Sequence, residues 1–341
     1  DTTKGTAVLS NIGGVYGSQD NLYVTESVWS NHPWWWEEGE MRTRVHRFDL
    51  STDPDRPTYQ ASGEVTGWLL NSFSMDEQDG DLRIATTEGW WGPEPSNNIF
   101  VLQEFEDRGH RTINPVGSIT DIAPGETLYS ARFMEDKGFI VTFERTDPLF
   151  TIDLKDPTNP RILGELEVTG FSNYLHPLGD DFLIGLGEEA DNDGRVMGMQ
   201  VSLFDVSDLS DPQLADRDVI LTGWSWSEAQ WDHQAFNYFD EYDALAVPVV
   251  QYDYNNNWRR VFTGLNLYSV SPEGGIDLIG RLDQSTLAAD GDEVDPWYDA
   301  WCSQVRRSVF MEDRVYAISA GGVVAAATLF DGRAGVIQQP L

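Results

Sequence analysis

The feature that most constrains this chain is a short acidic turn followed by an apolar strand, which recurs six times. These turns lie at 19–21, 79–81, 135–138, 179–181, 240–243 and 312–314. A strand-like run stands on both sides of each turn, which is the pattern of an antiparallel hairpin. A second hairpin follows the first in each copy, clearest around the turns 156–160 and 208–212 and weakest at 97–119 and 323–337. The pattern therefore predicts six units of four antiparallel strands, A to D.

Four-stranded units repeated without helical periodicity predict an all-β fold, a β-propeller in which each unit is one blade. A length of 341 residues would otherwise favour two domains. Because each blade buries its faces against its neighbours, we expect a single propeller domain over 1–341. A β-solenoid is the alternative, but its coils are shorter and need no internal hairpins. No apolar run is long enough to span a membrane.

The net charge of the chain limits the classes of partner that it is expected to bind. Asp and Glu total 57 against 22 Lys and Arg, for a formal net charge of −35. Such a field repels nucleic acid and anionic membranes, so neither is expected as a partner. Only Lys4, Lys137 and Lys155 are lysines. An acidic surface poor in lysine is typical of halophilic adaptation, since salt screens self-repulsion; an ordinary acidic secreted protein is the alternative.

Several stretches carry a family resemblance. They lie at 61–63, 70–77, 82–87, 129–134, 147–150, 174–177, 202–208, 231–236 and 306–308. As a block over 14–320, they resemble secreted bacterial and archaeal proteins with a C-terminal β-propeller domain distantly related to WD repeats. The resemblance implies a secreted or cell-surface protein and supplies no catalytic residues. It also implies further blade-like sequence ahead of Val15, hence an N-terminally trimmed portion of a longer chain whose full ring holds about six to eight blades.

The tryptophans gather in one part of the repeat. All 13 fall in or beside the B–C loops and D–A connections, which emerge at the same end of propeller blades. Loop packing accounts for some of them, but Trp34–Trp36 cannot all point inward from one extended segment. Exposed, clustered aromatic residues mark binding surfaces, and acidic neighbours suit sugars or cationic groups. The predicted binding residues are Trp34, Trp35, Trp36, Trp90, Trp91, Trp224, Trp226, Trp258, Trp297 and Trp301.

The predicted inner A strands carry a second, polar set. It comprises Asp76, Glu77, Arg132, His176, Asp232, His233, Arg306 and Arg307. One interpretation is a structural hydrogen-bonded network, with Arg132, His176, Arg306 and Arg307 lining the channel. The other is a channel-mouth site. Its catalytic candidates are Asp76, Glu77, Asp232 and His233, and its metal-binding version uses His176, His233 and a carboxylate.

A loop at 188–194 offers oxygen ligands at the short spacing of calcium loops, with Asp191 and Asp193 as candidate Ca²⁺ ligands. It lacks the closing Glu of an EF-hand, and a solvated acidic loop is the alternative. The chain contains neither a Gly-rich phosphate loop nor a Gly-x-Ser-x-Gly elbow.

Together these observations favour an extracellular, non-catalytic binding or scaffold propeller that engages a polymer or a partner protein through a Trp-rich face. The alternative is a hydrolase, glycoside-directed, that uses channel-mouth carboxylates. A metal-dependent or redox protein is the third hypothesis. Paired carboxylates about 5–10 Å apart in an open pocket would favour a glycosidase. Burial of the same groups against Arg132, Arg306 and Arg307 would favour a structural role.

Overall fold

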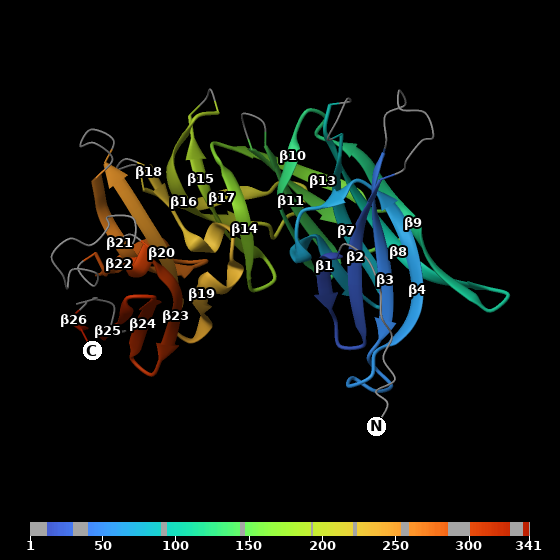
Figure 1. Ribbon diagram of the computed structural model, residues 1–341. Helices are drawn as coiled ribbons and strands as arrows, with labels where there is room; N and C mark the ends of the chain where they lie inside the picture. The colour runs from blue at the N-terminus through green and yellow to red at the C-terminus, as the bar shows by residue number, and fades with distance from the viewer. Residues whose placement is uncertain are drawn as a thin grey trace. The chain divides into compact units, whose positions relative to one another are not determined.

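The computed structural model describes residues 12–29, 40–89, 94–143, 147–191, 194–220, 224–253, 259–285, 301–327 and 337–340. Regular structure in these residues is almost entirely β-strand, with short 3₁₀ turns (Figure 1). No helix within them has the length and apolar character needed to cross a membrane. The chain divides into two compact units, of which the first spans 1–167 with 209–211 and the second holds the remainder.

The strands of the N-terminal unit form two sheets. Their bounds are β1 Ile12–Gly17, β2 Asn21–Trp29, β3 Met41–Asp49, β4 Thr58–Thr66, β5 Trp68–Leu69, β6 Met75–Gln78, β7 Asp81–Glu88, β8 Ser96–Asp107, β9 His110–Ile122, β10 Thr127–Met134, β11 Lys137–Phe143, β12 Asp147–Asp153 and β13 Arg161–Val168. One sheet has nine strands in the order β1-β2-β3-β4-β9-β8-β7-β5, with β6 also paired to β7, and the other runs β10-β11-β12-β13.

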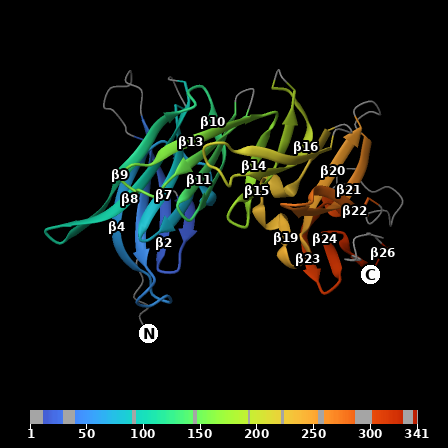
Figure 2. The same cartoon turned by 180° about the vertical axis from the view of Figure 1, so that it is seen from behind.

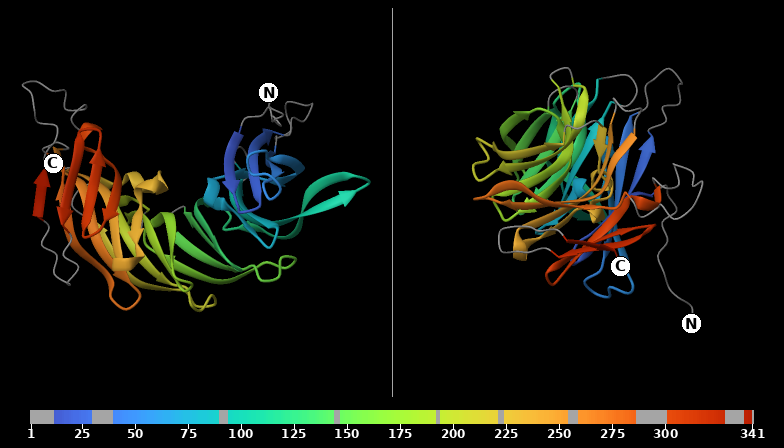
Figure 3. Two further views of the ribbon diagram at one scale, coloured as in Figure 1. Left: turned by 90° about the horizontal axis from the view of Figure 1, so that it is seen from below. Right: turned by 90° about the vertical axis from the view of Figure 1, so that its left-hand side faces the viewer.

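The nine-stranded sheet is a group of four strands, β1–β4, joined edge to edge to a group of five, β5–β9. β4 and β9 pair in parallel at Ser62 and Thr112, and the two strands lie side by side in opposite views (Figures 1 and 2). A Cβ on Gly63 would lie only 1.9 Å from the carbonyl oxygen of Ile113, so the close approach requires glycine. The β8–β9 hairpin reaches beyond the other strands of its unit (Figure 3). The sequence pattern of this hairpin is weak, although the hairpin is among the longest in the described chain.

The C-terminal unit contains three sheets. Its elements are β14 Phe171–Leu178, β15 Phe182–Ala190, β16 Val196–Asp205, β17 Gln213–Ile220, β18 Trp224–Trp226, β19 Asn237–Phe239, β20 Ala244–Asp253, β21 Arg259–Ser271, β22 Gly275–Asp283, β23 Val305–Met311, β24 Arg314–Ser319, β25 Gly322–Ala327 and β26 Ile337–Pro340. The sheets run β14-β15-β16-β17, then β18-β20-β21-β22 with β19 also paired to β20, then β23-β24-β25-β26.

The predicted hairpins are confirmed throughout the described chain. All six A–B pairs are antiparallel, and four of them contain a β-bulge or similar irregularity. Turn chemistry explains one of them directly, because Asp79 and Gly80 both have positive φ, as a two-residue type I′ turn requires. The second hairpins are confirmed too, including those at the two weak copies.

Apolar residues pack between successive sheets. In the N-terminal unit one cluster joins Ala85 and Val101 of one sheet to Ala131 and Ile140 of the next. In the C-terminal unit a cluster joins strands β20–β22 to strands β23–β25. In these two places, neighbouring sheets bury apolar faces against each other, which is the packing that the repeat predicted.

Two inner strands are interrupted, which the sequence analysis missed. The strand that pairs with β7 is split into β5 and β6 by the 3₁₀ turn η1, Ser72–Ser74. The strand that pairs with β20 is split into β18 and β19 by two such turns, η2 Glu228–Gln230 and η3 His233–Ala235. Local signals were present: Asn71 caps η1, and Ser227 with Gln230 forms a capping box.

Candidate functional site

The η2 insertion carries a carboxylate to the neighbouring sheet. The Ser227 side chain accepts a hydrogen bond from the Ala229 amide, and the Ser227 amide donates to the Gln230 side chain. This cap holds Glu228 where both of its carboxylate oxygens lie 2.7 Å from Nη1 of Arg306 on β23. The Gln304 side chain donates a further hydrogen bond of 2.7 Å to Glu228.

The η3 insertion makes a second bridge to the same strand. Asp232 caps η3 by accepting from the Gln234 amide, and its other oxygen accepts from Nη2 of Arg307 at 2.7 Å. Burial opposes ionisation, but the hydrogen bonds from Arg307 and Gln234 outweigh it and hold the pKa of Asp232 below its usual value. We expected Asp232 and His233 on the inner strand itself. That placement is wrong, because the cap turns the chain out of the strand before β19 begins.

An aromatic cluster surrounds His176 on β14. The Tyr174 hydroxyl lies 3.2 Å from Nδ1 of His176. The His176 ring lies 4.9 Å from Phe236 and 5.8 Å from Tyr238, and His233 stacks on Tyr174 at 6.5 Å between centroids. Over the residues that the structure describes, no group of three His, Cys, Asp or Glu side chains is placed to hold a metal ion. His176 and His233 are thus gathered by aromatic packing.

The predicted acid–base residues of the N-terminal unit lie on β6. Asp76 forms an ion pair with Arg83 and accepts a 3.2 Å hydrogen bond from the Tyr16 hydroxyl. Glu77 accepts hydrogen bonds from the Ser18 hydroxyl at 2.7 Å and from Nδ2 of the Asn21 side chain at 2.8 Å. Both carboxylates are therefore engaged by neighbouring side chains.

Arg132 on β10 differs from the other inner-strand arginines. Its guanidinium carbon lies 4.9 Å from the ring centroid of Phe73 in η1. Its Nε atom is buried without a hydrogen-bond partner. Arg306 and Arg307, in contrast, are paired with carboxylates.

These contacts bear on the catalytic alternative. The geometry is that of carboxylates held by arginine, hydroxyl and amide groups, which is the arrangement expected of a structural network. Glu188 on β15 differs from Asp232 in the direction of its pKa shift. Burial raises the pKa of Glu188, although a hydrogen bond from the Gln230 side chain opposes the shift. Glu188 was not among the predicted site residues, because no sequence pattern marks it as buried.

Two of the described tryptophans of the C-terminal unit are largely exposed to solvent. Trp231 follows η2 and is 72% exposed, and Trp301 precedes β23 and is 53% exposed. The Trp301 ring lies 6.0 Å from the Arg306 guanidinium carbon, so the ring borders the Glu228–Arg306 pair. On β18, Trp224 lies 6.4 Å from Trp226 and 5.7 Å from Tyr252 between ring centroids.

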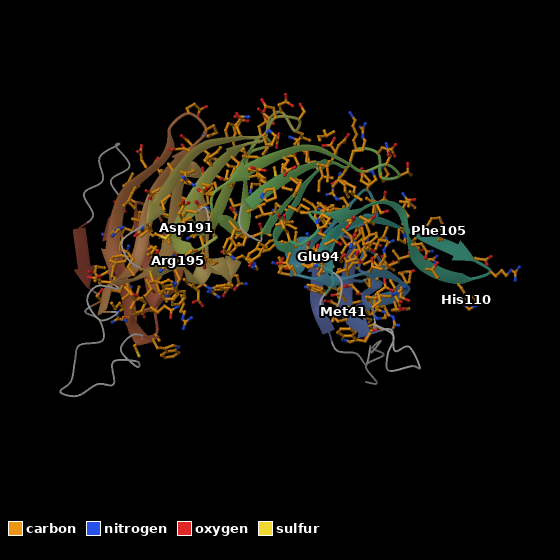
Figure 4. The ribbon with its side chains drawn as sticks, turned by 90° about the horizontal axis from the view of Figure 1, so that it is seen from above. Met41, Glu94, Phe105, His110, Asp191 and Arg195 are labelled. Atoms are coloured by element: carbon orange, nitrogen blue, oxygen red, sulfur yellow. The ribbon has the colours of Figure 1, made fainter. Side chains whose placement is uncertain are left out.

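Several predicted binding residues lie outside the described residues, namely Trp34, Trp35, Trp36, Trp90, Trp91, Trp258 and Trp297. Figure 4 labels Met41 and Glu94, which lie just after two of these segments. The candidate calcium ligand Asp193 is also outside them. Asp191 is described, and its side chain accepts a 2.9 Å hydrogen bond from the Arg195 amide across the hairpin (Figure 4). Calcium binding by this loop remains a prediction.

Comparison with known proteins agrees with the all-β, propeller-like class that the sheets define. The family model for the beta propeller domain matches residues 1–329, and the chain belongs to this family.

Two archaeal relatives are described as uncharacterized. The protein from Methanocaldococcus jannaschii is 41% identical over 221 residues, which is 64% of this chain and 32% of the relative. The protein from Archaeoglobus fulgidus is 34% identical over 247 residues, 68% of this chain and 36% of the relative. The matched region thus spans about a third of each relative. Among solved structures, the periplasmic gluconolactonase of Pseudomonas aeruginosa is similar in fold, with a TM-score of 0.51 and 14% identity over 98% of this chain and 86% of that one.

Proposed function

We propose that this protein is a non-catalytic binding propeller that works outside the cytoplasm and holds a neutral glycan polymer on its tryptophan-bearing loops. The observation that carries the proposal is the exposure of Trp301 beside the Glu228–Arg306 ion pair, together with the exposure of Trp231 at the end of η2. Large indole rings left in water on a folded protein are characteristic of binding surfaces.

The chemistry of this surface suits a sugar. An indole ring offers an apolar face to the C–H groups of a pyranose, and the adjoining charged side chains can exchange hydrogen bonds with its hydroxyls. A net charge of −35 favours a neutral polymer over an acidic one. The non-catalytic assignment rests on the engagement of Asp76, Glu77 and Asp232 by neighbouring side chains.

The arrangement of the sheets as blades is part of the same proposal. We infer that the six four-stranded groups are successive blades of one propeller domain. The common A-to-D strand order and the apolar clusters between successive sheets support this inference. Export and adaptation to salt are supported by the acidic, lysine-poor composition.

The test is depletion of the protein from solution by insoluble cellulose and chitin. We expect the wild type to bind at least one of them, and the double variant W231A/W301A to bind roughly tenfold or more weakly, because one buried aromatic anchor is typically worth about 2 kcal/mol. Met311 is the matched control. It is 55% exposed at the other end of β23, so M311A should bind like the wild type.

The melting temperature separates binding from folding. Since both tryptophans are more exposed than buried, W231A/W301A should melt close to the wild type. Failure of the wild type to bind either polymer, or equal binding by the double variant, would reject the glycan surface and favour a partner protein as the ligand.

A further inference from the structure

A pocket of about 340 Å³ opens between the inner strands of the N-terminal unit. Its walls include Tyr16, Phe73, Asp76, Arg132 and Phe133. Tyr16, Asp76 and Arg132 occupy equivalent positions of β1, β6 and β10, as their pairing with Tyr23, Arg83 and Phe139 shows. The volume lies within the range of small-molecule sites.

Arg132 is the unmatched charge in this pocket. No ion pair joins it to a carboxylate in the described part of the chain, and its buried Nε lacks a hydrogen-bond partner. Asp76 lines the same pocket but is already paired with Arg83 and Tyr16. An unpaired guanidinium is unexpected in a chain with 57 acidic and 22 basic residues.

The C-terminal unit shows how the same kind of arginine is otherwise neutralised. There, the η2–η3 insertion presents Glu228 and Asp232 to Arg306 and Arg307. In the N-terminal unit, the η1 insertion instead presents the ring of Phe73, which packs against the guanidinium of Arg132. Phe73 is fixed by the cap, since its amide donates to the Asn71 side chain at 2.9 Å. The planar Arg132 group is thus supported by an aromatic ring and left without a protein anion.

We propose that this pocket binds a small sugar acid, with its carboxylate on Arg132. A guanidinium fork matches a carboxylate through two parallel hydrogen bonds, and stacking on an aromatic ring pre-organises it. The Asp76 carboxylate and the Tyr16 hydroxyl on the facing strands offer partners for sugar hydroxyls. The pocket uses none of the tryptophans and lies in the other unit, so this proposal goes beyond the glycan surface and stands independently of it.

The experiment is calorimetric titration of the full chain with glucuronate, glucose and inorganic phosphate at physiological ionic strength. We expect glucuronate to bind, and glucose to bind at least roughly tenfold more weakly, since a hydrogen bond to a charged group is worth about 1.5–3 kcal/mol. R132Q should bind glucuronate at least roughly tenfold more weakly than the wild type does. The affinity of R132K for glucuronate should fall between those of R132Q and the wild type. The matched control is R161Q, because Arg161 is an exposed arginine of the same unit and its partner is Asp153.

Several results would overturn the proposal. These are absence of glucuronate binding to the wild type, equal binding of glucose, preference for phosphate, or unchanged glucuronate affinity in R132Q. If R132Q melts far below the wild type, R132K decides the matter, because it keeps the positive charge but cannot form the bidentate fork. Full glucuronate affinity in a folded R132K would then count against the site.

Discussion

At the scale of single residues, Glu188 shows how burial changes the pKa of a carboxyl group. Its half-buried carboxyl accepts a long hydrogen bond, 3.4 Å from Nε2 of the Gln230 side chain. Burial therefore raises its pKa above the ordinary value of a glutamate. A carboxyl with a raised pKa in the folded state contributes stability at low pH, where it is protonated in both states, and that stability is lost as the pH rises through the folded pKa.

We therefore predict that E188Q stabilises the protein at neutral pH. A neutral amide of the same shape removes the desolvation of the charge and can still accept from Gln230. The gain in melting temperature over the wild type should be present at neutral pH and vanish below the ordinary glutamate pKa. Glu165 on the exposed strand β13 offers the control, so E165Q should show no such pH-dependent difference. A gain that is constant across this pH range would contradict the explanation.

At the scale of elements, the edge contact between β4 and β9 depends on a missing side chain. Gly63 faces the backbone of Ile113, and a Cβ there would come within 1.9 Å of a carbonyl oxygen that cannot rotate away. The Arg47–Glu104 ion pair, at 3.2 Å, connects β3 to β8 across the same joint, and the Arg111 side chain of β9 donates a hydrogen bond to the Gln60 side chain of β4. The joint lets the long β8–β9 hairpin share a sheet with the preceding four strands.

G63A should destabilise the protein by about 1–3 kcal/mol, the usual cost of forcing extra volume into a packed position. Urea denaturation measures the change. Gly17 is the matched control, because it also lies in a strand of this unit and a Cβ there meets nothing within 4 Å. G17A should change stability by no more than about 0.5 kcal/mol. Equal effects of the two substitutions would show that chain flexibility, rather than the β4–β9 contact, sets the cost.

At the scale of the whole molecule, the dominant quantity is the net charge of −35. Most of the ion pairs in the described chain lie at least partly in water, where each contributes little. Ion pairs can also neutralise only a minority of the carboxylates, because the chain has 57 acidic residues and only 22 basic ones. Self-repulsion among the remainder opposes the compact state and is relieved by screening.

The melting temperature should therefore rise by several degrees as sodium chloride is increased from low to molar concentration. Chloride is the suitable salt, because sulfate stabilises most proteins through exclusion from their surface. Potassium chloride should act like sodium chloride if screening is the cause. A melting temperature that stays flat or falls would argue against adaptation to salt.

The sequence alone determined the strands and their turns. Alternating apolar residues and turn chemistry such as Asp79-Gly80 act over a few neighbours, so the hairpins, their order and the propeller-like class could be predicted. The placement of tryptophans beside these hairpins followed from the same local pattern. Trp301, one of the predicted binding residues, is exposed, and so is Trp231, which was not among them.

Only the tertiary structure decided which charges meet. Asp232 and Arg307 lie 75 residues apart, and their contact depends on the η3 insertion, whose capping signals are short and easily missed. In the same way, Arg132 and Arg306 were both predicted on inner strands, and only the structure shows that Arg306 is paired with a carboxylate whereas the buried Nε of Arg132 has no hydrogen-bond partner. The difference arises because one insertion carries Phe73 and the other carries Glu228 to the neighbouring strand. Long-range pairing depends on how successive sheets pack, and that is set by the summed burial of many side chains rather than by any local motif.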